Sequence, residues 1–415
     1  MFTAIQNSTH LGVRIHAVSP TEITINPINI AILLDTSGSM EGDRIEDVRR
    51  TLRAARELFH PSDTITLVTF GHSAKVHANY LKTDAEGLDR LYDILDKIKP
   101  EGSTNLSEGI DKLLRLSETN FDGLLLLTDG VINSGITSIC GLRTLTQSLV
   151  LVLSCAITTI GYGADHNRTL LRDIAVNSRG AYICVDSESK TNTSLPAIVG
   201  DLISGIHMEV IKNVTITVPF GLSCIEPIPT NIANQFFIGN IVPDRDYWMI
   251  YKKTDAFSSS SSSSITITGS TLPDSGVSVS HIPYSDCHEL QEQILRCRVA
   301  CALNRITECV GFAEVSSTIQ DIQSIQDIAD EIDSFPEDSN LRMRPLVIIM
   351  RAQLADVIAM KRSVTLPPPL LLARILSGAA TLSSQRSGGD PTAYNFSSTF
   401  QNSQAHEMVT RSTLL

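Results

Sequence analysis

Apolar and polar positions alternate in blocks along residues 28–207, and the blocks predict strands and helices in turn. Ile30–Leu34 is an uninterrupted apolar run, which is typical of a strand buried on both faces. Further strands are predicted at Thr64–Phe70, Lys75–Tyr80, Leu124–Thr128, Leu149–Ile160 and Ala181–Val185, and helices over residues 45–59, Leu88–Ile98, Leu106–Leu116, Asn167–Asn177 and Leu195–His207. This alternation predicts an α/β domain built on a doubly wound, mostly parallel sheet.

The segments on either side of this domain follow a different period. Residues 1–27 and 208–283 contain short runs such as Val214–Val218, in which apolar and polar residues alternate as in half-buried strands. These segments predict a small antiparallel β-sandwich, with the α/β domain inserted in it or flanked by it.

The remainder of the chain changes character twice more. Residues 284–363 carry apolar stripes at helical spacing and predict a helical region. Residues 364–415 are rich in Ser, Thr and Gln and form a tail. The predicted organisation is therefore an N-terminal strand segment (1–27), an α/β domain (28–207), a β domain (208–283), a helical region (284–363) and a tail (364–415).

Oxygen-bearing side chains gather where the buried strands end. Asp35, Ser37 and Ser39 follow the first buried strand at alternate positions, and Asp129 follows the run Leu124–Thr128. Thr104 offers a third hydroxyl just before a predicted helix. Ligands bind at the carboxyl ends of strands in open α/β sheets, and a hard cation needs several oxygen donors at one point. An alternative role for the Thr104 hydroxyl is to cap the helix.

Three segments carry a resemblance to a known family: the loop with Asp35, Ser37 and Ser39, the segment with Thr104, and the strand that ends at Asp129. In this order, they resemble the von Willebrand factor A (VWA) domain with its metal-ion-dependent adhesion site (MIDAS). The resemblance implies that Asp35, Ser37, Ser39, Thr104 and Asp129 surround one Mg²⁺, with Mn²⁺ or Ca²⁺ as alternatives. It also implies that a protein partner completes the coordination with an Asp or Glu. In the family, the loop after the second Asp shapes specificity, so the candidate rim residues are Val131, Ile132 and Asn133. The alternative is that the fold persists with an empty site.

A second, looser resemblance covers residues 284–405. This region is similar to the segment that follows VWA domains in the group that also carries intein-like Hint modules. No self-processing Cys block with a downstream His-Asn is found, so we expect the Hint module to be absent.

Composition limits the classes of partner and compartment. The formal net charge of −12 argues against nucleic acid. The start of the chain lacks the basic region and the apolar region that a secretory signal needs. The best candidate membrane span, Val364–Ala380, is too short and is interrupted by Pro367–Pro369. The eight cysteines are irregularly spaced, which fits reduced thiols better than a framework of disulfides. We therefore expect a cytoplasmic protein, with a virion as an alternative location.

The function that these patterns favour is a non-enzymatic, metal-dependent protein-interaction module. Two alternatives remain: a structural or assembly subunit of a larger complex or virion, and an adaptor subunit of an ATP-driven machine. In the latter case the ATPase is another chain, because the phosphate-binding pattern Gly-x₄-Gly-Lys-[Ser/Thr] is missing here. A metal-dependent hydrolase is disfavoured, because no general base is placed beside Asp35 and Asp129 in the sequence.

Overall fold

The computed structural model divides the chain into two compact units. One comprises Thr24–His207 and the other combines Met1–Ile23 with Met208–Pro367. The structure describes residues 2–18, 27–116, 120–130, 132–153, 155–163, 166–178, 180–185, 195–225, 234–243, 246–257, 265–270, 272–277, 279–281, 288–310, 315–336, 339, 341 and 344–361. The predicted tail, residues 364–415, lies outside the described residues.

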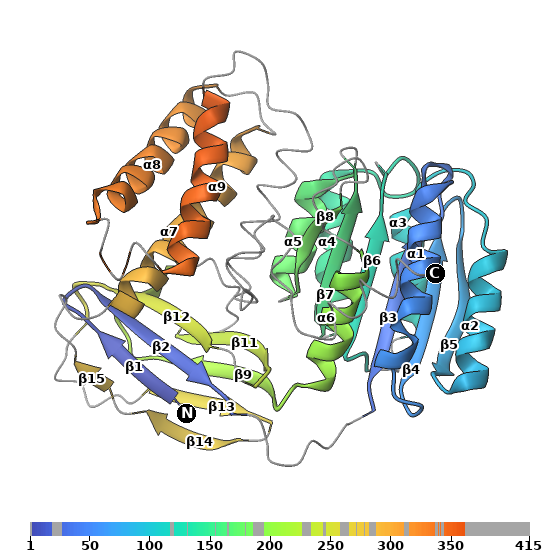
Figure 1. Cartoon of the computed structure of the whole chain (residues 1–415), viewed down its shortest axis with the longest axis horizontal. Coiled ribbons are helices and arrows are strands. Elements are labelled where there is room, and N and C mark those ends of the chain that lie inside the picture. Colours follow the sequence, from blue (N-terminus) through green and yellow to red (C-terminus); the bar gives the residue numbers. More distant parts are fainter. Residues whose placement is uncertain are drawn as a thin grey trace. The chain divides into compact units, whose positions relative to one another are not determined.

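The unit Thr24–His207 alternates strands and helices, as the sequence predicts (Figure 1). Its elements are β3 (Asn29–Asp35), η1 (Gly38–Met40), α1 (Asp43–Ala54), η2 (Ala55–Leu58), β4 (Thr64–Phe70), β5 (Ala74–Lys82), α2 (Ala85–Lys97), α3 (Leu106–Arg115), β6 (Gly123–Thr128), α4 (Ile139–Leu153), β7 (Ala156–Tyr162), α5 (Arg168–Asn177), β8 (Tyr182–Val185) and α6 (Leu195–His207). The strands form one sheet in the order β5-β4-β3-β6-β7-β8. Neighbouring strands are parallel except β4 and β5, which are antiparallel. The predicted doubly wound sheet is confirmed.

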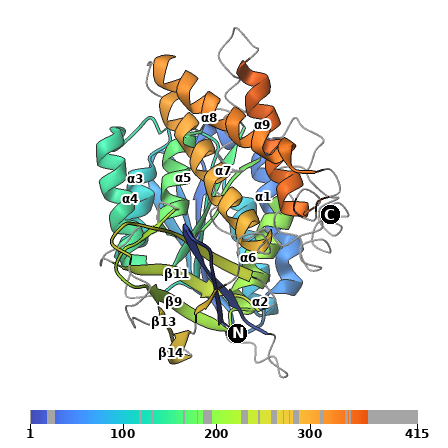
Figure 2. The ribbon, with the colours of Figure 1, turned by 90° about the vertical axis from the view of Figure 1, so that its left-hand side faces the viewer.

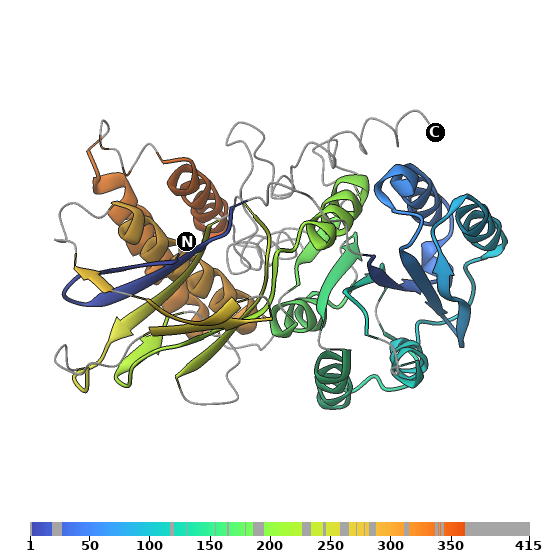
Figure 3. The same cartoon turned by 90° about the horizontal axis from the view of Figure 1, so that it is seen from below.

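Two hydrophobic cores cover the two faces of this sheet. Ile30, Ile32 and Leu34 of β3 face a core shared with α1, α2 and α6, whereas Ala31 and Leu33 face a core shared with α3, α4 and α5. Every residue of β3 is buried, because successive side chains of a central strand point to opposite, helix-covered faces. The strands run between two rows of helices (Figure 3).

One predicted strand is wrong in part. Leu149–Ile160 was expected to be a single buried strand, but Leu149–Leu153 forms the last turn of α4 and the strand β7 begins only at Ala156. Leu149 and Leu153 are buried, whereas Leu151 is 70% exposed. The run is apolar throughout, so its helical stripe at a spacing of four is hidden among neighbours that face solvent.

The second unit contains a β-sandwich. Its strands are β1 (Phe2–Gln6), β2 (His10–His16), β9 (Ile211–Thr217), β10 (Leu222–Cys224), β11 (Gln235–Ile241), β12 (Asp246–Lys253), β13 (Ile265–Gly269), β14 (Leu272–Val277) and β15 (Val279–His281). One sheet has the order β10-β12-β2-β1-β15 and the other β11-β9-β13-β14. Side chains from both sheets share one core. β2 pairs with β12, so the start of the chain and a segment beyond residue 208 lie in one sheet. The pair β1–β15 is parallel, unlike the other pairs of the sandwich.

Three helices complete this unit: α7 (His288–Val310), α8 (Val315–Ser334) and α9 (Pro345–Lys361). They pack against one another and appear side by side in Figure 2. Leu290 and Cys297 of α7 contact Trp248 and Ile250 of β12 in a small separate core. Within the described ranges, no helix has both the length and the apolar character needed to cross a bilayer.

Two helical glycines provide a test of how tightly the sheet is covered. A Cβ added at Gly109 of α3 would lie 2.9 Å from Phe70 Cβ and 3.1 Å from Leu33 Cδ1, whereas one at Gly205 of α6 would meet nothing within 4 Å. We expect Gly109→Ala to lower the free energy of unfolding by about 1–3 kcal/mol through overpacking. Gly205→Ala is the matched control and should raise it by about 0.5–1 kcal/mol. Urea unfolding of both variants measures this, and equal effects of the two substitutions would contradict the close helix–sheet packing.

Candidate metal centre

The candidate site lies at the carboxyl ends of two neighbouring parallel strands. β3 pairs with β6 in a register that places Leu34 beside Leu127, so that Asp35 and Thr128 end the two strands together. The chain passes from β3 to β4 on one side and later to β6 on the other side. The site therefore occupies the point where the strand order reverses, which is the usual ligand position in such sheets.

Asp35 is fully buried and its two carboxylate oxygens have separate partners. The Ser37 amide donates to Oδ1 over 2.8 Å, and the Thr128 hydroxyl donates to Oδ2. Burial raises the pKa of the Asp35 carboxyl, and the charge of Asp129 adds to this rise, while the hydrogen bonds from Thr128 and Ser37 oppose it. The site thus holds an ionisable carboxylate in surroundings that disfavour its charge.

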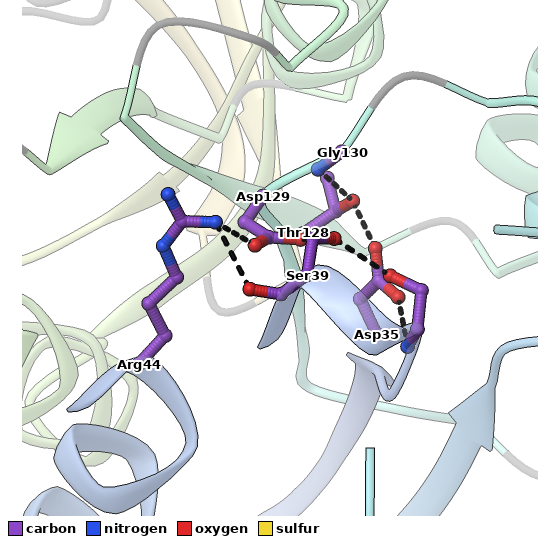
Figure 4. A network of polar contacts seen from close by, with 7 residues as sticks. Asp35, Ser39, Arg44, Thr128, Asp129 and Gly130 are labelled. Carbon is purple, nitrogen blue, oxygen red and sulfur yellow. Dashed lines mark hydrogen bonds and ion pairs between the residues drawn. The ribbon is translucent and has the colours of Figure 1, made fainter. Parts of the chain in front are cut away.

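Asp129 is also buried, and both of its oxygens are engaged (Figure 4). The Ser39 hydroxyl donates to Oδ1 over 2.7 Å, and the Ser37 and Ser39 hydroxyl oxygens lie 3.1 Å apart. The Arg44 guanidinium reaches from α1 and donates through Nη1 to Asp129 Oδ2 and, over 3.1 Å, to the Ser39 carbonyl oxygen. Two predicted ligands, Ser39 and Asp129, are therefore in direct contact, although 90 residues separate them in the chain.

Thr104 is held at the site by its backbone. Its amide donates to Asn133 Oδ1 over 2.8 Å, and the Asn133 amide donates back to the Thr104 carbonyl over 3.2 Å. The N-cap of α3 is Asn105, whose side chain accepts from the Glu108 amide. The alternative in which Thr104 caps this helix is therefore wrong, and its hydroxyl remains available to the site.

Gly130 marks the point on which the three hydroxyls converge. A Cβ added there would lie 3.1 Å from Thr104 Oγ1, 3.5 Å from Ser39 Oγ and 3.9 Å from Ser37 Oγ. Three side chains from two separate loops thus surround one small volume that the absence of a Cβ leaves open.

Backbone hydrogen bonds join the loops that carry these side chains. The Thr36 amide donates to the Phe70 carbonyl over 2.7 Å, and the Glu101 amide donates to the Thr36 carbonyl over 2.9 Å. The Gly38 amide donates to the Gly102 carbonyl over 3.1 Å. The loops after β3 and β4 and the loop before α3 are consequently fixed to one another.

The candidate rim residues occupy different environments. Asn133 is exposed but uses its side chain to hold Thr104. Ile132 is half-buried and packs against the core shared with α3, α4 and α5. Val131 lies outside the described residues.

A buried hydroxyl lies close to the charged groups of the site. Tyr162 ends β7, is 1% exposed, and its hydroxyl has no hydrogen-bond partner among the described residues. Burial raises its pKa well above the ordinary value, and the charges of Asp47 and Asp129 add to the rise while Arg44 opposes it. The phenol therefore stays neutral at physiological pH.

The donor set suits a hard cation. Two carboxylates and three hydroxyls are the oxygen ligands that Mg²⁺, Mn²⁺ and Ca²⁺ prefer. The part of the chain that the structure describes contains no group of three or more His, Cys, Asp or Glu side chains placed to hold a metal, so no zinc-type cluster competes with this site there. The convergence at Gly130 and the chemistry of the donors fit the ion that the sequence resemblance implies.

Comparison with known proteins agrees with this architecture. The family model of the von Willebrand factor type A domain matches residues 28–184, which include β3, β6 and all five candidate ligands. The chain contains a VWA domain. The rest of the chain, including the β-sandwich and α7–α9, lies outside this match.

Curated relatives match part of the chain at low identity. An uncharacterized protein of Synechocystis sp. is 26% identical over 170 residues, which cover 40% of this chain and 39% of that protein. Human inter-alpha-trypsin inhibitor heavy chain H3 is 21% identical over 217 residues, which cover 49% of this chain and 24% of that protein. The chain thus spans well under half the length of these relatives.

Solved structures share the fold over a larger part of the chain. A von Willebrand factor type A protein from Catenulispora acidiphila has a TM-score of 0.61 and 15% identity, covering 83% of this chain and 85% of that one. The ArnB paralog VWA2 from Sulfolobus acidocaldarius has a TM-score of 0.53 and 16% identity, covering 90% of this chain and 93% of that one. At such identities the likeness shows the fold alone.

Four residues of the site escaped the sequence analysis: Arg44, Thr128, Gly130 and Tyr162. Thr128 and Gly130 flank Asp129, so their proximity to it was visible, but their contacts with Asp35 and Thr104 depend on the pairing of β3 with β6. Arg44 belongs to a helix that contains several arginines, and the sequence does not show which of these arginines faces the site.

Two buried carboxylates should respond in opposite ways to neutralisation. Asp35 and Asp63 are both 0% exposed. Burial is the largest influence on Asp63 as well, but hydrogen bonds from His207 and the Ile28 and His60 amides outweigh it and lower the pKa. In EDTA at pH 7, Asp35→Asn should raise the urea midpoint and Asp63→Asn should lower it.

The pH dependence of unfolding checks the sign for Asp63. Because its folded pKa lies below the unfolded one, its stabilising contribution is present above the unfolded pKa and is lost as the pH falls through the folded pKa. The difference in stability between wild type and Asp63→Asn should therefore shrink in acid. A difference that stays constant from neutral to strongly acid pH would contradict the ionised, hydrogen-bonded Asp63.

Proposed function

We propose that the VWA domain binds one divalent cation, with Mg²⁺ as the first candidate, through Asp35, Ser37, Ser39, Thr104 and Asp129. The observation that carries this proposal is the convergence of the Ser37, Ser39 and Thr104 hydroxyls at Gly130, beside two buried carboxylates. When bound, the ion acts as a Lewis acid that accepts one more oxygen ligand from outside the chain.

The protein groups have distinct tasks in this proposal. The Asp35 and Asp129 carboxylates supply the negative charge, and the hydroxyls supply neutral oxygens. Thr128 and the Ser37 amide orient Asp35, while Asn133 positions Thr104.

VWA domains commonly serve as protein–protein interaction modules, and we propose this role here. The partner presents an Asp or Glu, whose carboxylate completes the coordination of the ion. The function is then binding rather than catalysis, and the β-sandwich with α7–α9 acts as scaffold or second interface. Asn133, which is exposed and bonds to Thr104, lies at the rim of the site.

Binding of Mg²⁺ is the direct test of the ion. We expect isothermal titration to show one Mg²⁺ per chain, and saturation at a hundred times the Kd to raise the free energy of unfolding by about 2.7 kcal/mol. Asp35→Asn should abolish binding. Gly130→Ala changes no ligand, yet should weaken binding about tenfold or more, because its Cβ would lie 3.1 Å from Thr104 Oγ1.

Thr36→Val is the matched control for these variants. Thr36 lies in the same loop, but its hydroxyl donates to the Phe70 carbonyl oxygen over 3.2 Å instead of facing the site. This variant should bind Mg²⁺ as wild type does. Full binding by Asp35→Asn, or equal loss in Thr36→Val and Asp35→Asn, would count against the proposed ligand set.

The partner is tested by capture with the immobilised chain. A partner that binds through the ion should be retained by wild type and Thr36→Val in Mg²⁺, and should be lost in EDTA and with Asp35→Asn or Asp129→Asn. Neutralising the acidic residue of the captured partner should have the same effect. A partner that is retained in all these conditions binds elsewhere on the chain, and the metal-dependent mechanism is then wrong for it.

A further inference from the structure

Arg44 is the residue of the site for which the metal-binding proposal has no role. It is the second residue of α1, five positions after Ser39. Its guanidinium bonds to the buried carboxylate of Asp129 and to the Ser39 carbonyl oxygen (Figure 4). The Arg44 side chain is 29% exposed, whereas that of Asp129 is 0% exposed.

A third segment, the residue after β7, lies near the guanidinium. A Cβ at Gly163, which directly follows β7, would lie 3.4 Å from Arg44 Nη2. Gly163 also has a φ of 66°, a conformation that favours glycine. Bonds to the loop after β3 and to the residue after β6 thus hold Arg44 at the edge of the site, where a side chain at Gly163 would meet it.

The carboxylate that pairs with Arg44 differs in burial from those that pair with other arginines of α1. Arg50 and Arg53 pair with the exposed carboxylates of Asp47 and Asp96, so their charges are screened by solvent. Arg44 instead pairs with a buried carboxylate that is itself a candidate ligand of the cation. With Asp35 and Asp129 counted as −1 each, Arg44 reduces the charge of the site from −2 to −1.

We infer that Arg44 is an internal competitor of the divalent cation, and that it sets the affinity of the site by occupying Asp129. This inference rests on the proposed function. Asp129 is stabilised either by the guanidinium or by the ion, and a cation that binds the carboxylate meets the positive charge of Arg44. The side chain therefore weakens metal binding while it protects the fold from an unpaired buried charge.

Arg44→Gln separates charge from hydrogen bonding, because a glutamine amide still donates but carries no charge. Isothermal titration with Mg²⁺ should show binding at least about tenfold tighter than in wild type, because Coulomb's law gives about this factor for a monovalent and a divalent cation close together even at the dielectric constant of water, and the site is partly buried. Arg44→Lys keeps the charge and should stay close to wild type. Arg50→Gln, on the same helix, is the matched control and should leave the affinity unchanged.

Thermal unfolding supplies a readout that does not depend on affinity alone. In EDTA, Arg44→Gln should unfold at a lower temperature than wild type, because Asp129 loses its counter-charge. At saturating Mg²⁺ this difference should disappear, since the ion replaces the guanidinium. If Arg44→Gln folds only when Mg²⁺ is present, the inference is supported; if it folds in neither condition, Arg44 has a structural role that the ion does not replace and the inference is wrong.

The outcomes separate this inference from the metal site itself. Equal or weaker Mg²⁺ binding by Arg44→Gln, with normal binding by wild type, overturns the inference alone. Binding by Arg44→Gln but not by wild type supports it and shows that Arg44 excludes the ion from the unaltered protein, against the proposed function. If neither protein binds Mg²⁺, the site and the inference are both wrong.

Discussion

Two buried carboxylates at the ends of neighbouring strands are the constraint on which the site depends. Asp35 and Asp129 carry like charges in surroundings that water does not reach, and such charges are costly unless they are paired. Each carboxylate oxygen accordingly has a donor within the chain: the Ser37 amide and Thr128 hydroxyl for Asp35, and the Ser39 hydroxyl and Arg44 guanidinium for Asp129. The arrangement of loops and helices around the site follows from this requirement.

The fold meets this requirement by placing rigid elements close together. α3 approaches the sheet at Gly109, where a methyl group would already collide with Phe70. The helix begins just after Thr104, and the mutual hydrogen bonds between Thr104 and Asn133 join the loop before α3 to the loop after β6. Side chains held on such elements keep their positions, which is the condition for a binding site with defined geometry.

The second unit also depends on contacts between segments that are distant in the sequence, here the strands of a β-sandwich. β1 and β2 pair with each other, and the strands that continue their sheet on either side, β12 and β15, lie more than 200 residues later in the chain. α7 then packs against this sheet, with Leu290 and Cys297 of the helix against Trp248 and Ile250 of β12. Along the chain, the VWA domain lies between the strands of this unit, because β1 and β2 precede it and β9–β15 follow it.

The sequence by itself determined the elements whose signals are local. Apolar runs predicted β3 and β6, the polar residues directly after them predicted where the site lies, and the spacing of apolar residues predicted most helices. It failed at Leu149–Leu153, where an unbroken apolar run does not reveal its period. Asp35, Ser37 and Ser39 were recognisable as a group because they are neighbours in one loop.

Only the tertiary structure decided which distant groups meet. The pairing of β3 with β6 brings Thr128 to Asp35, the close approach of three segments makes Gly130 a point of convergence, and α1 carries Arg44 to Asp129. None of these contacts has a signature in the local sequence, because each depends on strand register or on the side of a helix that faces the site. Short segments of the sequence therefore determine which donor groups the site contains, whereas the packing of the whole domain determines which charged groups contact one another.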